Sequence, residues 1–183
     1  MVPGFNEGDV LMHRPHLRDL PAPIPLDSEF TLREVEPEDE RALAELLERV
    51  FLQYGEQWDE DRVRRVLTEA DDVNAVYAVF WRGQPVATTS SQYLPDYADT
   101  AGFVHWVATH PDFRGKRLAS ALLARVLADF GERGYDGAWL ITQPDRVPAI
   151  RTYLKFGFVP EYRANGNDHR SRWSAIFPTV LNK

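Results

Sequence analysis

The chain has 183 residues, of which 44% are hydrophobic and 27% charged, and its formal net charge is −7 at pH 7. This length and composition indicate one domain with a proper core and exclude a disordered or fibrous protein. The acidic balance argues against non-specific nucleic-acid binding, and no apolar run is long enough to predict a membrane-spanning helix. The chain has no cysteine, which excludes disulfides, thiolate ligands and a cysteine nucleophile. We therefore expect a cytoplasmic protein with neither a nucleic-acid nor a membrane partner.

Residues 1–27 are predicted to form a Pro-rich, extended arm. Five prolines lie in this stretch, and each fixes φ and lacks a backbone donor, which excludes a helix. Apolar residues between them, such as Leu11 and Leu17, could hold the arm against the domain or a partner. The folded domain itself is expected to occupy residues 28–183.

The domain is predicted to begin with a strand and two helices. Residues 29–35 alternate between apolar and polar side chains, which is typical of a half-buried strand. Pro37 and the acidic residues after it begin a helix whose apolar positions continue to Phe51 at helical spacing. A second, short helix is expected after Trp58, with Asp59 as its N-cap.

A hairpin and a strand–loop–helix unit follow. Residues 73–81 and 86–93 are rich in β-forming side chains and flank a turn, which predicts a hairpin. A loop at 94–100 leads into a strand that ends with residues 104–109. Apolar side chains at helical spacing over 118–130 then predict a long helix.

The last part is predicted to complete the sheet. We expect strands at 138–142 and 158–162, with a helix between them that begins at an Asp145 cap and ends at Gly157. A final strand at 172–177 would close the sheet. Strand–helix–strand crossovers require parallel pairing here, whereas hairpins give antiparallel pairing elsewhere. The predicted fold class is therefore α/β, with a mixed, mostly antiparallel sheet and helices on both faces.

The loop before the long helix is the candidate ligand site. It contains Arg114, Gly115, Lys116 and Arg117, so unpaired N–H groups and the positive end of the helix dipole meet three basic side chains. Gly115 would allow close approach of the backbone to an anion. These residues favour a phosphate site, and the alternative is an ordinary turn with basic side chains in water.

Two motifs in this order of elements resemble the GNAT (Gcn5-related) N-acetyltransferase superfamily over roughly residues 28–177. The first is Arg-Gly-Lys-Arg-Leu-Ala at 114–119, similar to the family's acyl-CoA signature of Arg or Gln, two residues, Gly, one residue, and Gly or Ala. The second, at 149–158, is similar to Ala-Ile, two residues, Tyr, three residues, Gly-Phe. Arg117 stands where the family usually has Gly, so we expect an ordinary helical φ there. Arg146 stands where the family often has Asn.

The resemblance implies a GNAT fold with a central sheet splayed at a bulge, and an enzyme that uses acetyl-CoA as cosubstrate. The acetyl group would pass directly to a primary amine of a small molecule or peptide. No metal is expected, because the five histidines show no ligand pattern. The implied coenzyme contacts are the main chains of Val107, Ala108 and Thr109 at the bulge, followed by Arg114, Gly115, Lys116, Arg117, Leu118, Ala119 and Ser120 in the phosphate loop.

Two residues match catalytic positions of the family. Tyr153 matches the general acid beside the coenzyme sulfur, and a phenol can protonate a thiolate; the alternative is a structural tyrosine of the core. His105 matches a histidine that helps to deprotonate the amine in serotonin-type N-acetyltransferases. A structural strand histidine is the other interpretation. The carboxylate base of histone-type members is not matched, since its position falls near Ala101.

Three functions remain open. The leading hypothesis is an N-acetyltransferase; the others are a catalytically silent acyl-CoA-binding regulatory module and an enzyme acting on protein N-termini or lysines. We expect the acceptor site to be shaped by the two early helices and by residues 94–100 and 164–169. Tyr54 and Trp58, between those helices, could line a pocket or belong to the core. A homodimer paired through the last strands is also expected.

Overall fold

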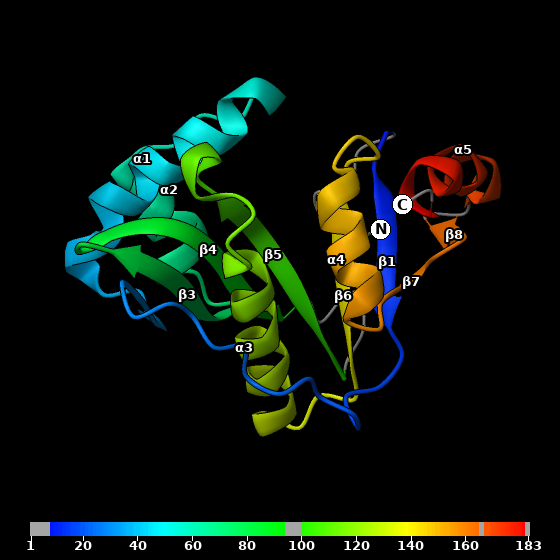
Figure 1. The fold of residues 1–183 in the computed structure, drawn as a ribbon, viewed down its shortest axis with the longest axis horizontal. Coiled ribbons are helices and arrows are strands. Elements are labelled where there is room, and N and C mark those ends of the chain that lie inside the picture. Colours follow the sequence, from blue (N-terminus) through cyan, green and yellow to red (C-terminus); the bar gives the residue numbers. More distant parts are fainter. Residues whose placement is uncertain (1–7, 94–99, 165–166, 182–183) are drawn as a thin grey trace.

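The computed structural model describes residues 8–93, 100–164 and 167–181, which form a twisted sheet covered by helices on both faces (Figure 1). Seven strands of this described part are joined in the order β2-β3-β4-β5-β6-β1-β7, and only the β5–β6 pair is parallel. Their bounds are β1 Val10–Arg14, β2 Phe30–Glu34, β3 Val73–Trp81, β4 Gln84–Tyr93, β5 Ala101–Thr109, β6 Gly137–Thr142 and β7 Val159–Pro160. A separate two-stranded ribbon pairs β8 (Arg163–Ala164) with β9 (Asn167–Asp168).

The helices divide between the two faces of the sheet. Helices α1 (Glu40–Phe51) and α2 (Glu60–Val63) cover one face, and α3 (Leu118–Glu132) and α4 (Val147–Lys155) cover the other (Figure 1). Helix α5 (Arg170–Leu181) packs beside α4. The predicted mixed α/β fold, its two early helices and its long central helix are confirmed.

The helix starts follow from local chemistry. Before α1, Glu36 and Asp39 form a reciprocal capping box around Pro37. The side chain of Asp59 caps α2 by accepting a hydrogen bond from the N–H of Arg62 at 2.7 Å, as predicted. The Asp145 cap predicted for α4 is wrong: the N-cap is Arg146, whose side chain makes no capping bond, and Asp145 is exposed.

The two ends of the chain differ from the prediction. Part of the expected arm, Val10–Arg14, is strand β1, which lies between β6 and β7 and pairs antiparallel with both. The strand predicted at 172–177 is wrong, because these residues belong to α5. Strand β1 fills the position in the sheet that a final strand would need, and its first three residues are at most 1% exposed. The apolar residues of α5 instead recur at helical spacing and bury Trp173 and Ile176.

Arg14 joins β1 to the end of α4. Its buried guanidinium donates to the carbonyls of His16 at 3.0 Å, Asp19 at 2.6 Å and Phe156. The Phe156 carbonyl lies just past the last turn of α4, where backbone acceptors lack partners within the helix. Burial lowers the pKa of Arg14, although the charge of Asp19 opposes this effect. The N-terminal strand therefore supports the helix that carries Tyr153.

Candidate active site

Strand β5 separates from β6 in the middle of the sheet. The parallel pairing of the two strands runs from Ala101 to Val104 and stops there, whereas β5 continues to Thr109. On its other edge, β5 has one extra residue between the pairs Ser90–His105 and Thr88–Ala108, which is a β-bulge. The predicted splayed sheet with a bulge is confirmed, and the bulge lies where the strands separate.

The bulge brings two neighbouring side chains to the same face. Successive side chains of a regular strand alternate between faces, but Trp106 has a positive φ of 50°. The rings of His105 and Trp106 stack at 4.6 Å, and Trp106 also contacts Phe51 at 5.4 Å and Trp58 at 4.6 Å. His105 and Trp106 thus both lie on the α1 side, while Val107 packs against the core on the α3 side. We call these four rings, with Tyr54, the aromatic wall.

His105 is held as a neutral imidazole. Its Nδ1 lies 2.7 Å from Oε1 of Gln92, whose Nε2 donates to Asp72 at 2.8 Å. Because the amide oxygen only accepts, Nδ1 carries the proton and Nε2 keeps its lone pair. Burial lowers the pKa of His105 to about 4, so the ring is uncharged at neutral pH. Since Nε2 bonds to none of the described residues, it is able to accept a proton.

Tyr153 is a buried, protonated phenol on α4. Its side chain is 4% exposed and packs against Phe158 at a ring distance of 6.0 Å. Burial raises the pKa of Tyr153, and the nearby positive charge of Arg146 opposes that rise. The hydroxyl forms no hydrogen bond with the described residues. A phenol in this state can donate a proton to a developing anion.

Arg146 crosses the space between the separated strands. From the start of α4 it donates through Nη2 to the carbonyl of Val107 at 3.0 Å. Its guanidinium carbon lies 5.6 Å from the ring centre of Phe51 and 5.9 Å from that of Tyr54. The resemblance marks this position as one where the family often has an Asn that contacts the coenzyme, and it gives the arginine itself no role.

The basic loop leads directly into α3. Gly115 has a φ of +81°, and Arg117, the N-cap of α3, has a φ of +60°. The expectation of an ordinary helical φ at Arg117 is therefore wrong, since the residue keeps the left-handed conformation that a glycine would adopt. No N–H group of residues 115–120 is bonded to any described residue. Exposed donors and basic side chains together can bind an anion.

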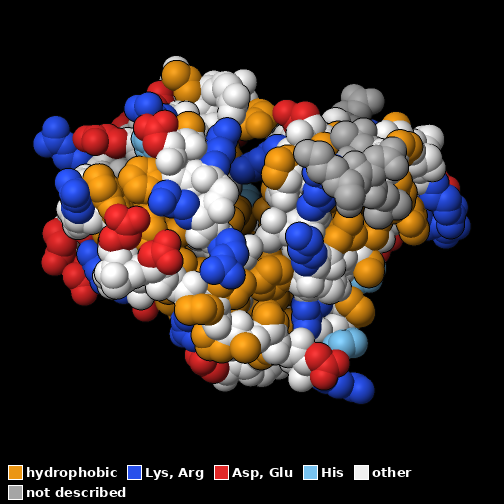
Figure 2. Space-filling view, in the orientation of Figure 1, with side chains coloured by type: hydrophobic (Ala, Val, Ile, Leu, Met, Phe, Trp, Pro, Cys, Tyr) orange, Lys and Arg blue, Asp and Glu red, His pale blue; other side chains and the backbone are white. Residues whose placement is uncertain are grey.

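The lysine of the basic loop lies close to the start of β2. Lys116 Nζ lies 3.8 Å from the Glu29 carboxylate and 5.6 Å from the centre of the Phe30 ring, at the start of β2. Figure 2 shows the surface hollowed between the β5–α3 connection and α4, with lysine and arginine side chains on the rim. The splayed strands, the basic loop and α4 thus surround one hollow.

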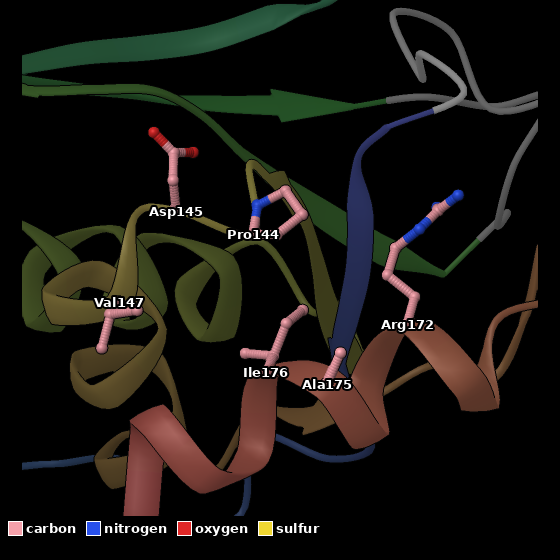
Figure 3. A pocket seen from close by; sticks show the side chains of 6 residues that line it. All are labelled: Pro144, Asp145, Val147, Arg172, Ala175 and Ile176. Carbon is pink, nitrogen blue, oxygen red and sulfur yellow. The ribbon is translucent and has the colours of Figure 1, made fainter.

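A second cavity lies elsewhere, between the β6–α4 connection and α5. It measures about 400 Å³, and Figure 3 shows Ile176 and Ala175 of α5 facing the connection. Arg172, at its edge, donates to the Asp9 carbonyl at 2.6 Å. None of the β5 residues beyond the last β5–β6 pair lines this cavity. Within the described ranges, no cluster of three or more His, Asp or Glu could hold a metal ion, and no helix is long and apolar enough to cross a membrane.

The acceptor-shaping segments predicted outside the helices are described only in part. Residues 94–99 of the first loop lie outside the described residues, and so do 165 and 166 of the second. The described part of the second segment contains β8 and β9, with His169 buried beside them. The α1 side of the hollow is therefore defined here by the aromatic wall and Arg146.

Comparison with known proteins gives the same fold. A GCN5-related N-acetyltransferase from Sphaerobacter thermophilus superposes with a TM-score of 0.65 at 22% identity, covering 84% of this chain and 48% of that one. The ribosomal-protein-S18-alanine N-acetyltransferase of Escherichia coli gives a TM-score of 0.58 at 18% identity, covering 75% and 97%.

Curated relatives match over part of their length. A mycothiol acetyltransferase of Actinosynnema mirum is 28% identical over 172 residues, which are 88% of this chain and 51% of that protein. One of Nocardia farcinica is 36% identical over 76 residues, covering 39% and 25%. The chain thus spans about half, or less, of these relatives. The sequence profile of the Acetyltransferase (GNAT) family matches residues 41–158, more than half of the chain. By this match, and with the splayed sheet to support it, the chain belongs to the GNAT acetyltransferase family.

Proposed function

We propose that this chain is an acetyl-CoA-dependent N-acetyltransferase that acts on a primary amine of a small molecule or peptide. The observation that carries the proposal is the alignment of the splayed, bulged strand β5 with the uncapped start of α3. This arrangement offers backbone groups that β6 does not pair at one point and an anion site at the next. Both are needed to hold a long thioester that ends in phosphates.

The coenzyme contacts follow from that alignment. The N–H groups of residues 115–120, with Arg114, Lys116 and Arg117, would bind phosphate oxygens. The main chains of Val107, Ala108 and Thr109, beyond the last β5–β6 pair, would bind the pantetheine arm and the thioester carbonyl. Backbone donors fixed where negative charge develops stabilise the tetrahedral intermediate without reorganising.

Two side chains would move the protons. His105 Nε2 accepts the proton of the attacking amine, directly or through one water, while Gln92 fixes the ring. Tyr153 donates its phenolic proton to the departing thiolate. The neutral state of each group at pH 7 is the state that its role requires. These groups favour the enzyme over the alternative of a silent acyl-CoA-binding module.

The acceptor would bind on the α1 side, at the aromatic wall. Tyr54 is 37% exposed there, so its ring can contact a bound molecule. Because the curated relatives are mycothiol acetyltransferases, an amine related to mycothiol belongs among the acceptors to be tested. The N-terminal strand β1 would belong to this acetyltransferase domain, and the homodimer stays a prediction.

The test is a titration followed by turnover. We would titrate acetyl-CoA into the wild type and Tyr153→Phe by calorimetry, and then follow thiol release with a panel of amines. Comparable binding in both proteins, with turnover at least tenfold slower in the variant, would support an enzyme with Tyr153 as acid. Binding without turnover would favour the silent module. Absence of binding would refute the coenzyme assignment.

A further inference from the structure

We infer that the acceptor carries an anionic group close to its amine, and that Arg146 binds this group through a charge-assisted contact. The inference rests on the proposed function and adds the chemical class of the acceptor. It starts from the half-buried guanidinium of Arg146, which lies where β5 and β6 separate. This guanidinium pairs with no carboxylate among the described residues.

The other half-buried arginines of the described chain satisfy their charge or their donors within the fold. Arg33 forms a two-bond pair with Asp39 at 2.6 and 3.0 Å, and Arg64 donates through Nε to the Glu40 carboxylate at 2.7 Å. Arg14 reaches three carbonyls. Arg146 has one bond, to the Val107 carbonyl, so most of its five donors are unused. An incompletely bonded guanidinium in a partly desolvated place is stabilised by an anion that arrives with the ligand.

Its position assigns the guanidinium to the acceptor and not to the coenzyme phosphates. The phosphate loop contacts the start of β2, where Lys116 faces Glu29 and Phe30. Arg146 instead reaches from α4 to Phe51 and Tyr54, two rings of the aromatic wall. Phe51 belongs to the core cluster on the α1 face of the sheet, so these distances place the guanidinium near the α1 side of β5.

A second observation on the same wall also indicates a ligand rich in acceptors. The indole N–H groups of Trp58 and Trp106 are buried and have no hydrogen-bond partner within the described residues. Trp58 is 6% exposed, and Trp106 contacts Phe51, the ring that also faces Arg146. The aromatic wall thus contains two unsatisfied donors beside the Arg146 cation, and an acceptor-rich group that inserts between its rings would satisfy them. Ionised carboxylate and phosphate groups supply acceptors alone, which matches this set.

Charge balance supports the same acceptor class. An amine enters largely as an ammonium, which Arg146 would repel across a partly desolvated hollow. A molecule with an acidic group near the amine cancels this repulsion, and a plain amine does not. Arg146 would therefore favour one class of amine and disfavour the other.

Matched pairs of amines test the inference. Thiol release would be measured at saturating acetyl-CoA for phenylalanine against phenylalaninamide, β-alanine against β-alaninamide, and O-phosphoethanolamine against ethanolamine. We expect the wild type to prefer the anionic member of at least one pair by about 10- to 100-fold in kcat/KM, mainly through KM. Arg146→Asn should reduce that ratio at least tenfold and Arg146→Lys by less, because lysine keeps the charge but loses the fork. The matched control is Arg65→Asn, at an exposed arginine away from the splay.

The contrary outcomes are distinct. Equal rates within every pair for the wild type, or an unchanged preference in Arg146→Asn, would overturn the inference. So would a weaker acetyl-CoA titration in Arg146→Asn with the acceptor preference intact, because it would assign Arg146 to the coenzyme. If acetyl-CoA binds but no amine reacts, the transferase proposal fails. Calorimetric binding of each pair to the coenzyme A complex then decides the inference, which fails if acid and amide bind equally.

Discussion

The left-handed Arg117 lets the conformational and electrostatic roles of the phosphate loop be separated. A side chain with a Cβ at a φ of +60° costs about 1–2 kcal/mol, whereas glycine adopts this conformation freely. Glycine loses about 0.5–1 kcal/mol of this advantage through its greater freedom in the unfolded chain. We therefore expect Arg117→Gly to be about 1 kcal/mol more stable than Arg117→Ala. Unfolding entropy scaled to 183 residues converts this difference to about 2–3 °C in Tm.

The assay compares the two variants with each other, because both lose the same charge. Thermal and urea unfolding without coenzyme give the stability difference, and calorimetry gives the acetyl-CoA affinity. Both variants should bind acetyl-CoA more weakly than the wild type and within about twofold of each other, since only the guanidinium contact is lost. An Arg117→Ala variant as stable as Arg117→Gly would refute the strained left-handed cap. Unchanged acetyl-CoA affinity in both would remove Arg117 from the phosphate site.

Three further changes have defined outcomes. Gly102→Ala should cost about 1–3 kcal/mol in urea unfolding, because a Cβ there would lie 2.3 Å from the fully buried Phe130 ring; an unchanged midpoint would contradict that packing. Burial lowers the pKa of His105 from an ordinary 6.5 to about 4 in the folded chain. Between these pH values the imidazole is protonated in the unfolded chain and neutral in the folded one, so stability falls as the pH drops from about 6.5 to about 4. His105→Asn, which can still donate to Gln92, should flatten this part of the pH–stability curve, and an identical curve would show that His105 is not buried as described. Arg14→Met should lower stability by about 1.5–3 kcal/mol, read from denaturant midpoints, because the Phe156 carbonyl loses a charged donor; a neutral result would mean that water replaces it.

Sequence periodicity predicted the interior of the fold and failed at its ends. Strands such as Val73–Trp81 and the helix Leu118–Glu132 carry their own signals in alternation, helical spacing and turn residues. The strand Val10–Arg14 lies among prolines and is stabilised by partners near the other end of the chain, which no local pattern reveals. The error at 172–177 had the same origin, because the sheet position assigned to it was already filled.

The candidate site likewise has a part that the sequence predicted and a part that it did not. Gly115 and the basic residues beside it were identified by motif, because their backbone and charge act locally. The shift of Trp106 to the face of His105 depends on a bulge one residue long, whose place is fixed by pairing with β4. The reach of Arg146 to Val107 and Phe51 depends on how far two strands separate. Such distances are properties of the assembled sheet and not of any segment.

The place of β1 also sets the order in which the chain can fold. This strand leaves the ribosome well before its partners β6 and β7, which follow it in the sequence after most of the other strands. The apolar residues Val10, Leu11 and Met12 must therefore wait unpaired while most of the sheet assembles. During that interval the same strand of another nascent copy could occupy the open position, giving exchanged dimers. Slow dilution from denaturant should favour the closed monomer, and refolding at high protein concentration should favour the exchanged form.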